Sequence, residues 1–109
     1  MSYCIINCTV QNKKSAVEIA KHLVKKKLIA CCNIIPSVTS VYMWKDKLQE
    51  DSEVLMVMKT ETTLFNQIET EIKKLHSYDI PEIICIPINN GSRKYLDWID
   101  EQILMKEGQ

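Results

Sequence analysis

The feature that most constrains this fold is the segment 32–60, which has the pattern of two long β-strands meeting at a tight turn near residues 45–47. Each arm has about thirteen residues, which at ~3.3 Å per residue gives roughly 40 Å of strand. A single domain of this length has a diameter of roughly 34 Å. Because a projecting two-stranded ribbon is marginal on its own in water, we predict that it lies on another copy of the chain and that the oligomer is the functional unit.

Charge and composition exclude several classes of protein. Fourteen Lys and Arg residues balance fourteen Asp and Glu residues, so no basic excess favours a nucleic-acid partner. No apolar run approaches the roughly 20 residues of a membrane-spanning helix, and the N-terminal segment MSYCIINCTV carries no charged leader. The five cysteines are odd in number and lack CxxC spacing, which argues against a disulfide framework. We expect a cytoplasmic protein with no membrane partner.

Hydrophobic periodicity predicts the elements around the hairpin. We expect strands at 3–10 and 83–88, helices at 15–27 and 63–75, and a last helix from Ser92 to about Met105. The order β-α-β-β-α-β-α is typical of an α+β ferredoxin-like sandwich, with a four-stranded antiparallel sheet and two helices on one face. We therefore predict a single domain over residues 1–109, with a long hairpin and a C-terminal helix. Pro36 cannot donate to a sheet ladder, which predicts a bulge or an edge in the first hairpin arm.

A series of short segments resembles a known family. The segments are ACCNIIP (30–36), YMWK (42–45), EDSE (50–53), KT (59–60), HSYDIPE (76–82) and YLDWI (95–99). In this order and spacing they resemble the CutA divalent-cation tolerance family over about nine-tenths of the chain. The resemblance implies a homotrimer whose hairpins embrace neighbouring subunits, an architecture similar to that of the PII signalling proteins. It also implies a link to tolerance of copper and other divalent metals.

The chain departs from the family pattern at two positions. Asp46 stands where the family often has glycine, and aspartate tolerates left-handed turn geometry better than most residues. Cys32 stands where the family usually has an aliphatic residue, so the family's own cysteine corresponds to Cys31.

Metal binding is the first candidate chemistry, with copper or another divalent cation as the expected ion. Cys31 and His76 are the candidate ligands. Soft donors that suit Cu(I) also include Cys32, Cys85, His22, Met56 and Met58. Adjacent strand residues point to opposite faces, so any site must combine distant residues, which can come from different subunits. The alternative is that Cys4, Cys8 and Cys85 pack in the core and that His22 is a solvated side chain.

A small-ligand cleft between subunits is the second candidate. Six residues recur in the resembling segments and carry polar tips or charges suited to clefts and interfaces: Tyr42, Trp44, Lys59, Tyr78, Glu82 and Trp98. The alternative is that Trp44 and Trp98 are interface anchors and that Lys59 forms a structural ion pair with Glu82.

Catalysis has weaker support in the sequence. A Cys31–His76 thiolate pair is chemically conceivable, but nothing supplies an orienting third residue, and the two glycines, Gly91 and Gly108, form no phosphate loop. We expect no enzyme. The sequence predicts a trimeric cytosolic binding or signalling protein linked to divalent metal tolerance and homeostasis. The alternative is a PII-like trimer that senses a small ligand or acts as a scaffold, with metal binding incidental.

Overall fold

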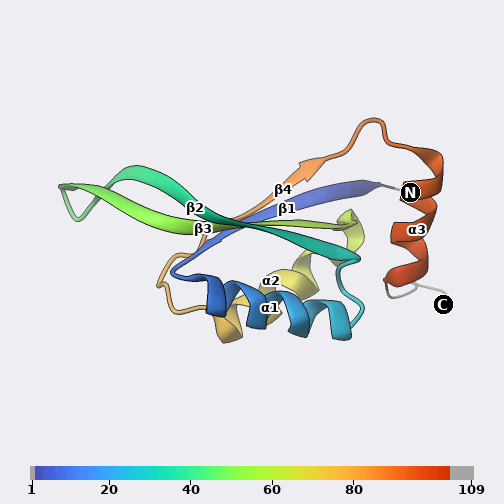
Figure 1. The fold of residues 1–109 in the computed structure, drawn as a ribbon, viewed down its shortest axis with the longest axis horizontal. Helices are drawn as coiled ribbons and strands as arrows, with labels where there is room; N and C mark the ends of the chain where they lie inside the picture. The colour runs from blue at the N-terminus through green and yellow to red at the C-terminus, as the bar shows by residue number, and fades with distance from the viewer. Residues whose placement is uncertain (1, 104–109) are drawn as a thin grey trace.

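Four strands form one antiparallel sheet with two helices against one face (Figure 1). The computed structural model describes residues 2–103, and the strands lie in the order β2-β3-β1-β4. The strands are β1 (Tyr3–Val10), β2 (Cys31–Trp44), β3 (Lys47–Glu61) and β4 (Ile83–Pro87). The helices are α1 (Lys13–Lys25), α2 (Phe65–Leu75), which follows the 3-10 turn η1 (Thr62–Leu64), and α3 (Arg93–Gln102). This arrangement confirms the predicted ferredoxin-like α+β fold.

The helix boundaries differ from the sequence prediction at both ends of the chain. Asn12 caps α1, because its Oδ1 accepts a hydrogen bond from the backbone N–H of Ser15 at 2.8 Å. The helix therefore begins two residues earlier than predicted. At the other end α3 stops at Gln102, and Ile103 is already extended; residues 104 and 105 of the predicted helix lie outside the described residues.

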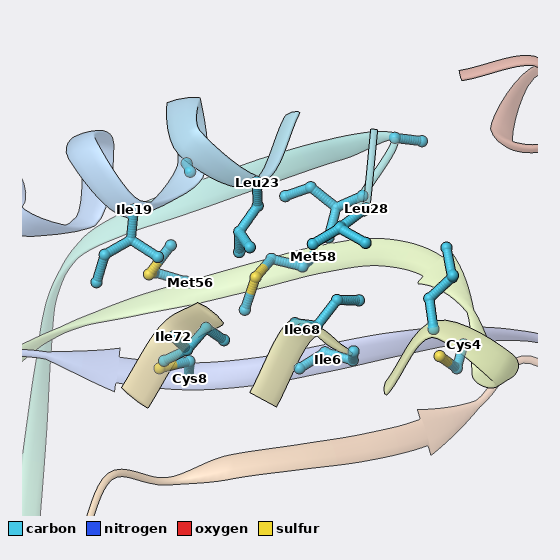
Figure 2. Packing of buried hydrophobic residues seen from close by; sticks show 14 of the residues in the cluster. Cys4, Ile6, Cys8, Ile19, Leu23, Leu28, Met56, Met58, Ile68 and Ile72 are labelled. Carbon is cyan, nitrogen blue, oxygen red and sulfur yellow. The ribbon is translucent and has the colours of Figure 1, made fainter. Parts of the chain in front are cut away.

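The core lies between the sheet and helices α1 and α2, and it is rich in sulfur. Alternate residues of β1 and β3 face the helices, where Ile19 and Leu23 of α1 and Ile68 and Ile72 of α2 cover them (Figure 2). The fully buried sulfur residues there are Cys4, Cys8, Met56 and Met58. Burial is the largest cause that raises the pKa of the Cys4 thiol, and likewise of the Cys8 thiol, to about 12. These sulfur atoms serve as core packing, as the sequence predicts for both cysteines; Cys85 is half-buried against the same cluster.

A tight connection joins α1 to β2. Lys27 has a φ of 59°, and its N–H donates to the Val24 carbonyl while that of Leu28 donates to Leu23, both at 3.0 Å. This is the Schellman pattern, in which a left-handed residue usually occupied by glycine ends a helix. The buried Thr60 hydroxyl of β3 then donates to the Leu28 carbonyl at 2.6 Å, which fixes the connection against the sheet.

The β2–β3 hairpin extends beyond the body of the molecule (Figure 1). The principal extents are 47 × 27 × 23 Å. At the tip, Lys45 and Asp46 have φ values of 51° and 65°, as a two-residue type I′ turn requires. Asp46 thus adopts the left-handed conformation expected of it. The pairing register shifts between Ile35 and Val38, which confirms the predicted irregularity at Pro36.

The second face of the sheet stays open along most of its length within residues 2–103 (Figure 1). Apolar side chains from all four strands lie on this open face: Ile5, Ile35, Leu55, Val57, Ile84 and Ile86. Ile84 is 50% exposed and Ile86 is 42% exposed. Among the described residues, the buried Asn7 Oδ1 has no hydrogen-bond partner. An extended apolar surface of this kind is typical of a protein–protein contact.

Candidate ligand cleft at the base of the hairpin

A cleft of about 830 Å³ lies at the base of the hairpin. Residues of the hairpin form one wall and residues of the loop between α2 and β4 form another, and Thr9 at the end of β1 also lines the cleft. The side chains that matter most for its chemistry are Tyr42, Trp44, Asp51, Glu53, Tyr78, Asp79 and Glu82. This volume is within the range of about 300–1,000 Å³ that is usual for small-molecule sites.

Strand alternation places the hairpin residues of the cleft on one face. Tyr42 and Trp44 are two residues apart in β2, so their side chains share a face. Ser40 pairs with Asp51, which brings Asp51 to the same side. The Tyr42 hydroxyl donates to Asp51 Oδ2 at 2.5 Å. That hydrogen bond, with smaller contributions from burial and from the negative charge of Asp51, raises the pKa of Tyr42.

A second phenol–carboxylate pair crosses the cleft. The Tyr78 hydroxyl of the loop donates to Glu53 Oε2 at 2.8 Å, and Glu53 is only 9% exposed. Burial first, and then the hydrogen bond to Glu53 and its charge, raise the pKa of Tyr78 well above its usual value. Both phenols therefore stay protonated at neutral pH and keep donating their hydrogen bonds to the two carboxylates.

His76 holds the loop in place. Its Nδ1 accepts the backbone N–H of Tyr78 at 3.1 Å, which assigns the proton of a neutral ring to Nε2. Nε2 then donates to the carbonyl of Thr9, at 2.8 Å. The imidazole also packs on the Tyr78 ring, with a centroid separation of 4.6 Å. Both ring nitrogens are thus engaged in positioning the loop against β1.

The other predicted site residues lie in a second cluster. Cys31 pairs with Lys59 across β2 and β3, and its Sγ lies 3.6 Å from the Tyr95 hydroxyl of α3. Tyr95 packs on Trp98 with ring centroids 5.5 Å apart. The Lys59 ammonium donates to Asn33 Oδ1. The structure therefore brings together Tyr42, Trp44, Tyr78 and Glu82 in the cleft, whereas Cys31, Lys59 and Trp98 lie elsewhere.

The two clusters are separated along the sheet. Cys31 lies opposite Lys59, whereas Thr9, the partner of His76, lies opposite Leu55. Four strand residues correspond to roughly 13 Å, so Cys31 and His76 do not meet within one chain. Among the residues that the structure describes, no group of three or more His, Cys, Asp or Glu side chains is arranged to hold a metal ion. Within the same residues, Lys59 and Glu82 form no ion pair.

His22 is not the unpaired solvated side chain that the sequence suggests. Its Nε2 lies 2.7 Å from Glu71 Oε1, joining α1 to α2. Lys74 reaches the other oxygen of Glu71 at 3.1 Å. The hydrogen bond from His22, followed by that from Lys74, lowers the pKa of Glu71 to about 2. The sequence could not show this pairing, because the two residues are 49 positions apart.

Asp51 and Glu53 are cleft residues that the sequence prediction did not select. The available signal was their spacing: two residues apart in one strand, they share a face with each other. What the sequence could not show is that the loop of residues 76–82 folds back over that face and buries Glu53.

Comparison with known proteins gives a consistent family assignment. The family model described as CutA1 divalent ion tolerance protein matches residues 4–102. The chain is 43% identical over 97 residues to the divalent-cation tolerance protein CutA of Thermus thermophilus, covering 89% of this chain and 94% of that protein. It is 44% identical over 91 residues to human protein CutA, covering 84% of this chain but 51% of the human protein.

Solved structures agree with the sequence relatives. The crystal structure of CutA1 from Oryza sativa superposes with a TM-score of 0.93 at 36% identity, covering 95% of each chain. The divalent cation tolerance protein structure from Thermus thermophilus gives a TM-score of 0.90 at 42% identity, covering 93% of this chain and 98% of that one.

Proposed function

Since this chain belongs to the CutA1 divalent ion tolerance family, we propose that it acts as a homotrimeric, cytoplasmic binding and signalling protein in divalent metal tolerance and homeostasis. Residues 1–109 act as one CutA-like domain in this proposal. The chain spans nearly all of the Thermus relative but about half the length of the human and mouse relatives. The function of those longer proteins as a whole therefore extends to this chain only as part of the proposal.

The observation that carries the proposed assembly is the combination of a projecting hairpin with an open apolar sheet face. Near the tip, Val41, Met43 and Leu48 are 64%, 60% and 73% exposed. Apolar side chains of this size at such exposure favour burial against further copies of the chain. Closed assembly also covers the edge strands β2 and β4, which would otherwise pair without control.

For the metal link we propose Cys31 and His76 as ligands contributed by different subunits, with copper as the preferred ion. The separation of the two residues within one chain supports a site shared between subunits. Cys31 is half-buried and its thiol is directed towards α3 rather than into the core. A thiol with an imidazole is a donor set that suits copper. Binding at His76 would have to replace one of its two loop hydrogen bonds.

A copper titration tests this assignment. The purified protein is titrated with Cu(I) held in a competing chelator, and Cys31→Ser is compared with Cys32→Ser. Cys32 is the matched control, because it is adjacent in sequence but packs against the core. We expect stoichiometric binding that Cys31→Ser weakens and Cys32→Ser leaves intact. Equal binding by both variants and the parent would remove Cys31 from the site.

A second candidate function is favoured by the cleft itself. A PII-like trimer that senses a small ligand would use a largely preformed pocket at the hairpin base, where two phenol–carboxylate pairs are already in place. In this case metal association is incidental. Both candidates are binding functions. Within one chain, the thiol of Cys31 and the imidazole of His76 are too far apart to form a nucleophile–base pair.

A further inference from the structure

We propose that the cleft at the base of the hairpin binds an aliphatic polyamine, a ligand with several ammonium groups separated by short methylene chains. This inference rests on the proposed function of the cleft as a ligand site and assigns the chemical class of that ligand. It draws on the charge of the cleft, the burial of one carboxylate, the spacing of the charges and the aromatic wall.

The cleft concentrates negative charge in a chain that is neutral overall. Its walls contain four carboxylates, Asp51, Glu53, Asp79 and Glu82, and no Lys or Arg is among the described residues that line it. The hydroxyls of Tyr42 and Tyr78 already donate hydrogen bonds to two of these carboxylates, those of Asp51 and Glu53. What remains for a ligand is a set of oxygen acceptors under negative potential, so the complementary ligand is a cation that brings N–H donors.

Glu53 is a buried carboxylate of the cleft whose charge is incompletely neutralised. The residue is only 9% exposed, yet among residues 2–103 its hydrogen-bond partner is the neutral Tyr78 phenol, on Oε2. No Lys, Arg or His of the described residues lies within ion-pair distance of it. A buried carboxylate without a cationic partner is unfavourable, and an ammonium group entering the cleft would supply that partner.

The spacing of the carboxylates favours an extended cation over a compact one. Asp51 and Glu53 lie on the same face of β3, two residues and therefore roughly 7 Å apart. Asp79 and Glu82 stand on the loop opposite. Charges distributed in this way match ammonium groups distributed along a flexible aliphatic chain, each of which can meet a separate carboxylate.

The aromatic wall already associates with an ammonium group. The Lys45 ammonium lies 6.0 Å from the centroid of the Trp44 ring, which is within cation–π range. Trp44 and Tyr42 lie on the same face of β2 and line the cleft. Their ring faces suit both the charge of an amine and the methylene groups between amines.

Spermidine is the probe that tests the proposal. It is titrated calorimetrically into the purified full chain in about 150 mM salt, which screens non-specific attraction between exposed charges. Glu53→Gln removes the buried charge without changing shape, and Trp44→Leu removes the ring. Glu50→Gln is the matched control, because it removes the same charge from an exposed neighbour in β3 whose side chain points to the other face. N-acetylated spermidine, with one charge fewer, is the control ligand.

We expect saturable binding at one site per chain, weakened about tenfold or more by Glu53→Gln or Trp44→Leu and unchanged by Glu50→Gln. N-acetylated spermidine is expected to bind more weakly than spermidine. If Glu53→Gln does not assemble, Asp51→Asn at the exposed edge of the cleft takes its place.

Absence of saturable binding overturns the proposal, and so does equal weakening by Glu50→Gln and Glu53→Gln. If spermidine binds only after Lys45 and Lys47 are both changed to Gln, an ammonium of the chain itself fills the cleft and the proposal is also wrong. A trimer that ignores spermidine contradicts the ligand class alone, whereas a monomer contradicts the proposed function.

Discussion

The Tyr78–Glu53 hydrogen bond gives the sharpest test of how the cleft is held together. Tyr78→Phe removes only the hydroxyl that donates to Glu53 Oε2 at 2.8 Å. Hydrogen bonds to charged groups contribute about 1.5–3 kcal/mol. Because Tyr78 is itself half-buried, water can reach the vacated position in part, and we expect a loss of about 1–2 kcal/mol in the free energy of unfolding.

The assay is urea unfolding at one fixed protein concentration, since the stability of an oligomer depends on concentration. Tyr95→Phe is the control, because within the described part of the chain its hydroxyl meets the Cys31 sulfur alone, at 3.6 Å, and we expect a change below about 0.5 kcal/mol. A double-mutant cycle with Glu53→Gln isolates the pair. In the protein that already carries Glu53→Gln, the loss caused by Tyr78→Phe should shrink, because the acceptor no longer carries a charge.

The pH dependence of stability gives an independent reading of the same pair. Burial and the bond to Glu53 raise the pKa of Tyr78 above its ordinary value near 10. A group whose pKa is raised on folding contributes stability that is complete below its unfolded pKa and is lost as the pH rises above it. The parent protein should therefore lose stability above pH 10 more steeply than Tyr78→Phe. A Tyr78→Phe loss below about 0.5 kcal/mol, or identical losses with and without the Glu53 charge, would refute the reasoning.

Three further predictions concern the scaffold. Glu71→Gln should make the stability of the protein less dependent on pH in acid. Folding lowers the pKa of Glu71 from 4.5 to about 2, so the stability that its carboxylate contributes is present above pH 4.5 and is lost as the pH falls towards 2. Superimposable acid titrations of the parent and the variant, followed by circular dichroism, would contradict this. Lys27→Gly should stabilise the protein by about 0.5–1 kcal/mol in urea unfolding, because glycine adopts the φ of 59° without the strain of a side chain. The control Lys26→Gly, at a helical φ of −79°, should destabilise the protein instead. A change in the free energy of unfolding with the same sign for both variants would be inconsistent with the geometry. Thr60→Val should lower the free energy of unfolding by about 1–3 kcal/mol, because it removes the buried hydroxyl that donates to the Leu28 carbonyl. Thr60→Ser keeps that hydrogen bond and should lower the free energy of unfolding less. If thermal unfolding gives the reverse order, the Thr60 hydroxyl does not fix this connection.

Local patterns in the sequence were sufficient to predict most of the fold. Alternation and helical periodicity identified the strands and helices, and Pro36 and Asp46 marked the irregularity and the turn of the hairpin, both seen in the structure. The predicted start of α1 is two residues late, because the cap is Asn12, whose side chain accepts the backbone N–H of Ser15. Side-chain caps of this kind compete over a few residues, so propensity alone does not decide between them.

The candidate site was predictable only in part, because its geometry depends on long-range packing. The resembling segments led to Tyr42, Trp44, Tyr78 and Glu82, which the structure places around one cleft. They also led to Lys59, which lies instead at the far end of the sheet, beside Asn33. No pattern in the neighbouring sequence distinguishes Lys59 from the four residues that line the cleft. The loop of residues 76–82 is held over the hairpin base by His76, and that tertiary contact is what creates the cleft and buries Glu53.

Assembly of the hairpin and the open sheet face onto further copies of the chain is the central claim, and the molar mass in solution tests it most directly. Light scattering on the chromatographically purified protein at micromolar concentration should give three times the chain mass of 12.7 kDa. The mass should not change on dilution within that range. A mass of one chain would contradict the account, because the exposed apolar hairpin and the open face of the sheet would then have no surface to cover them.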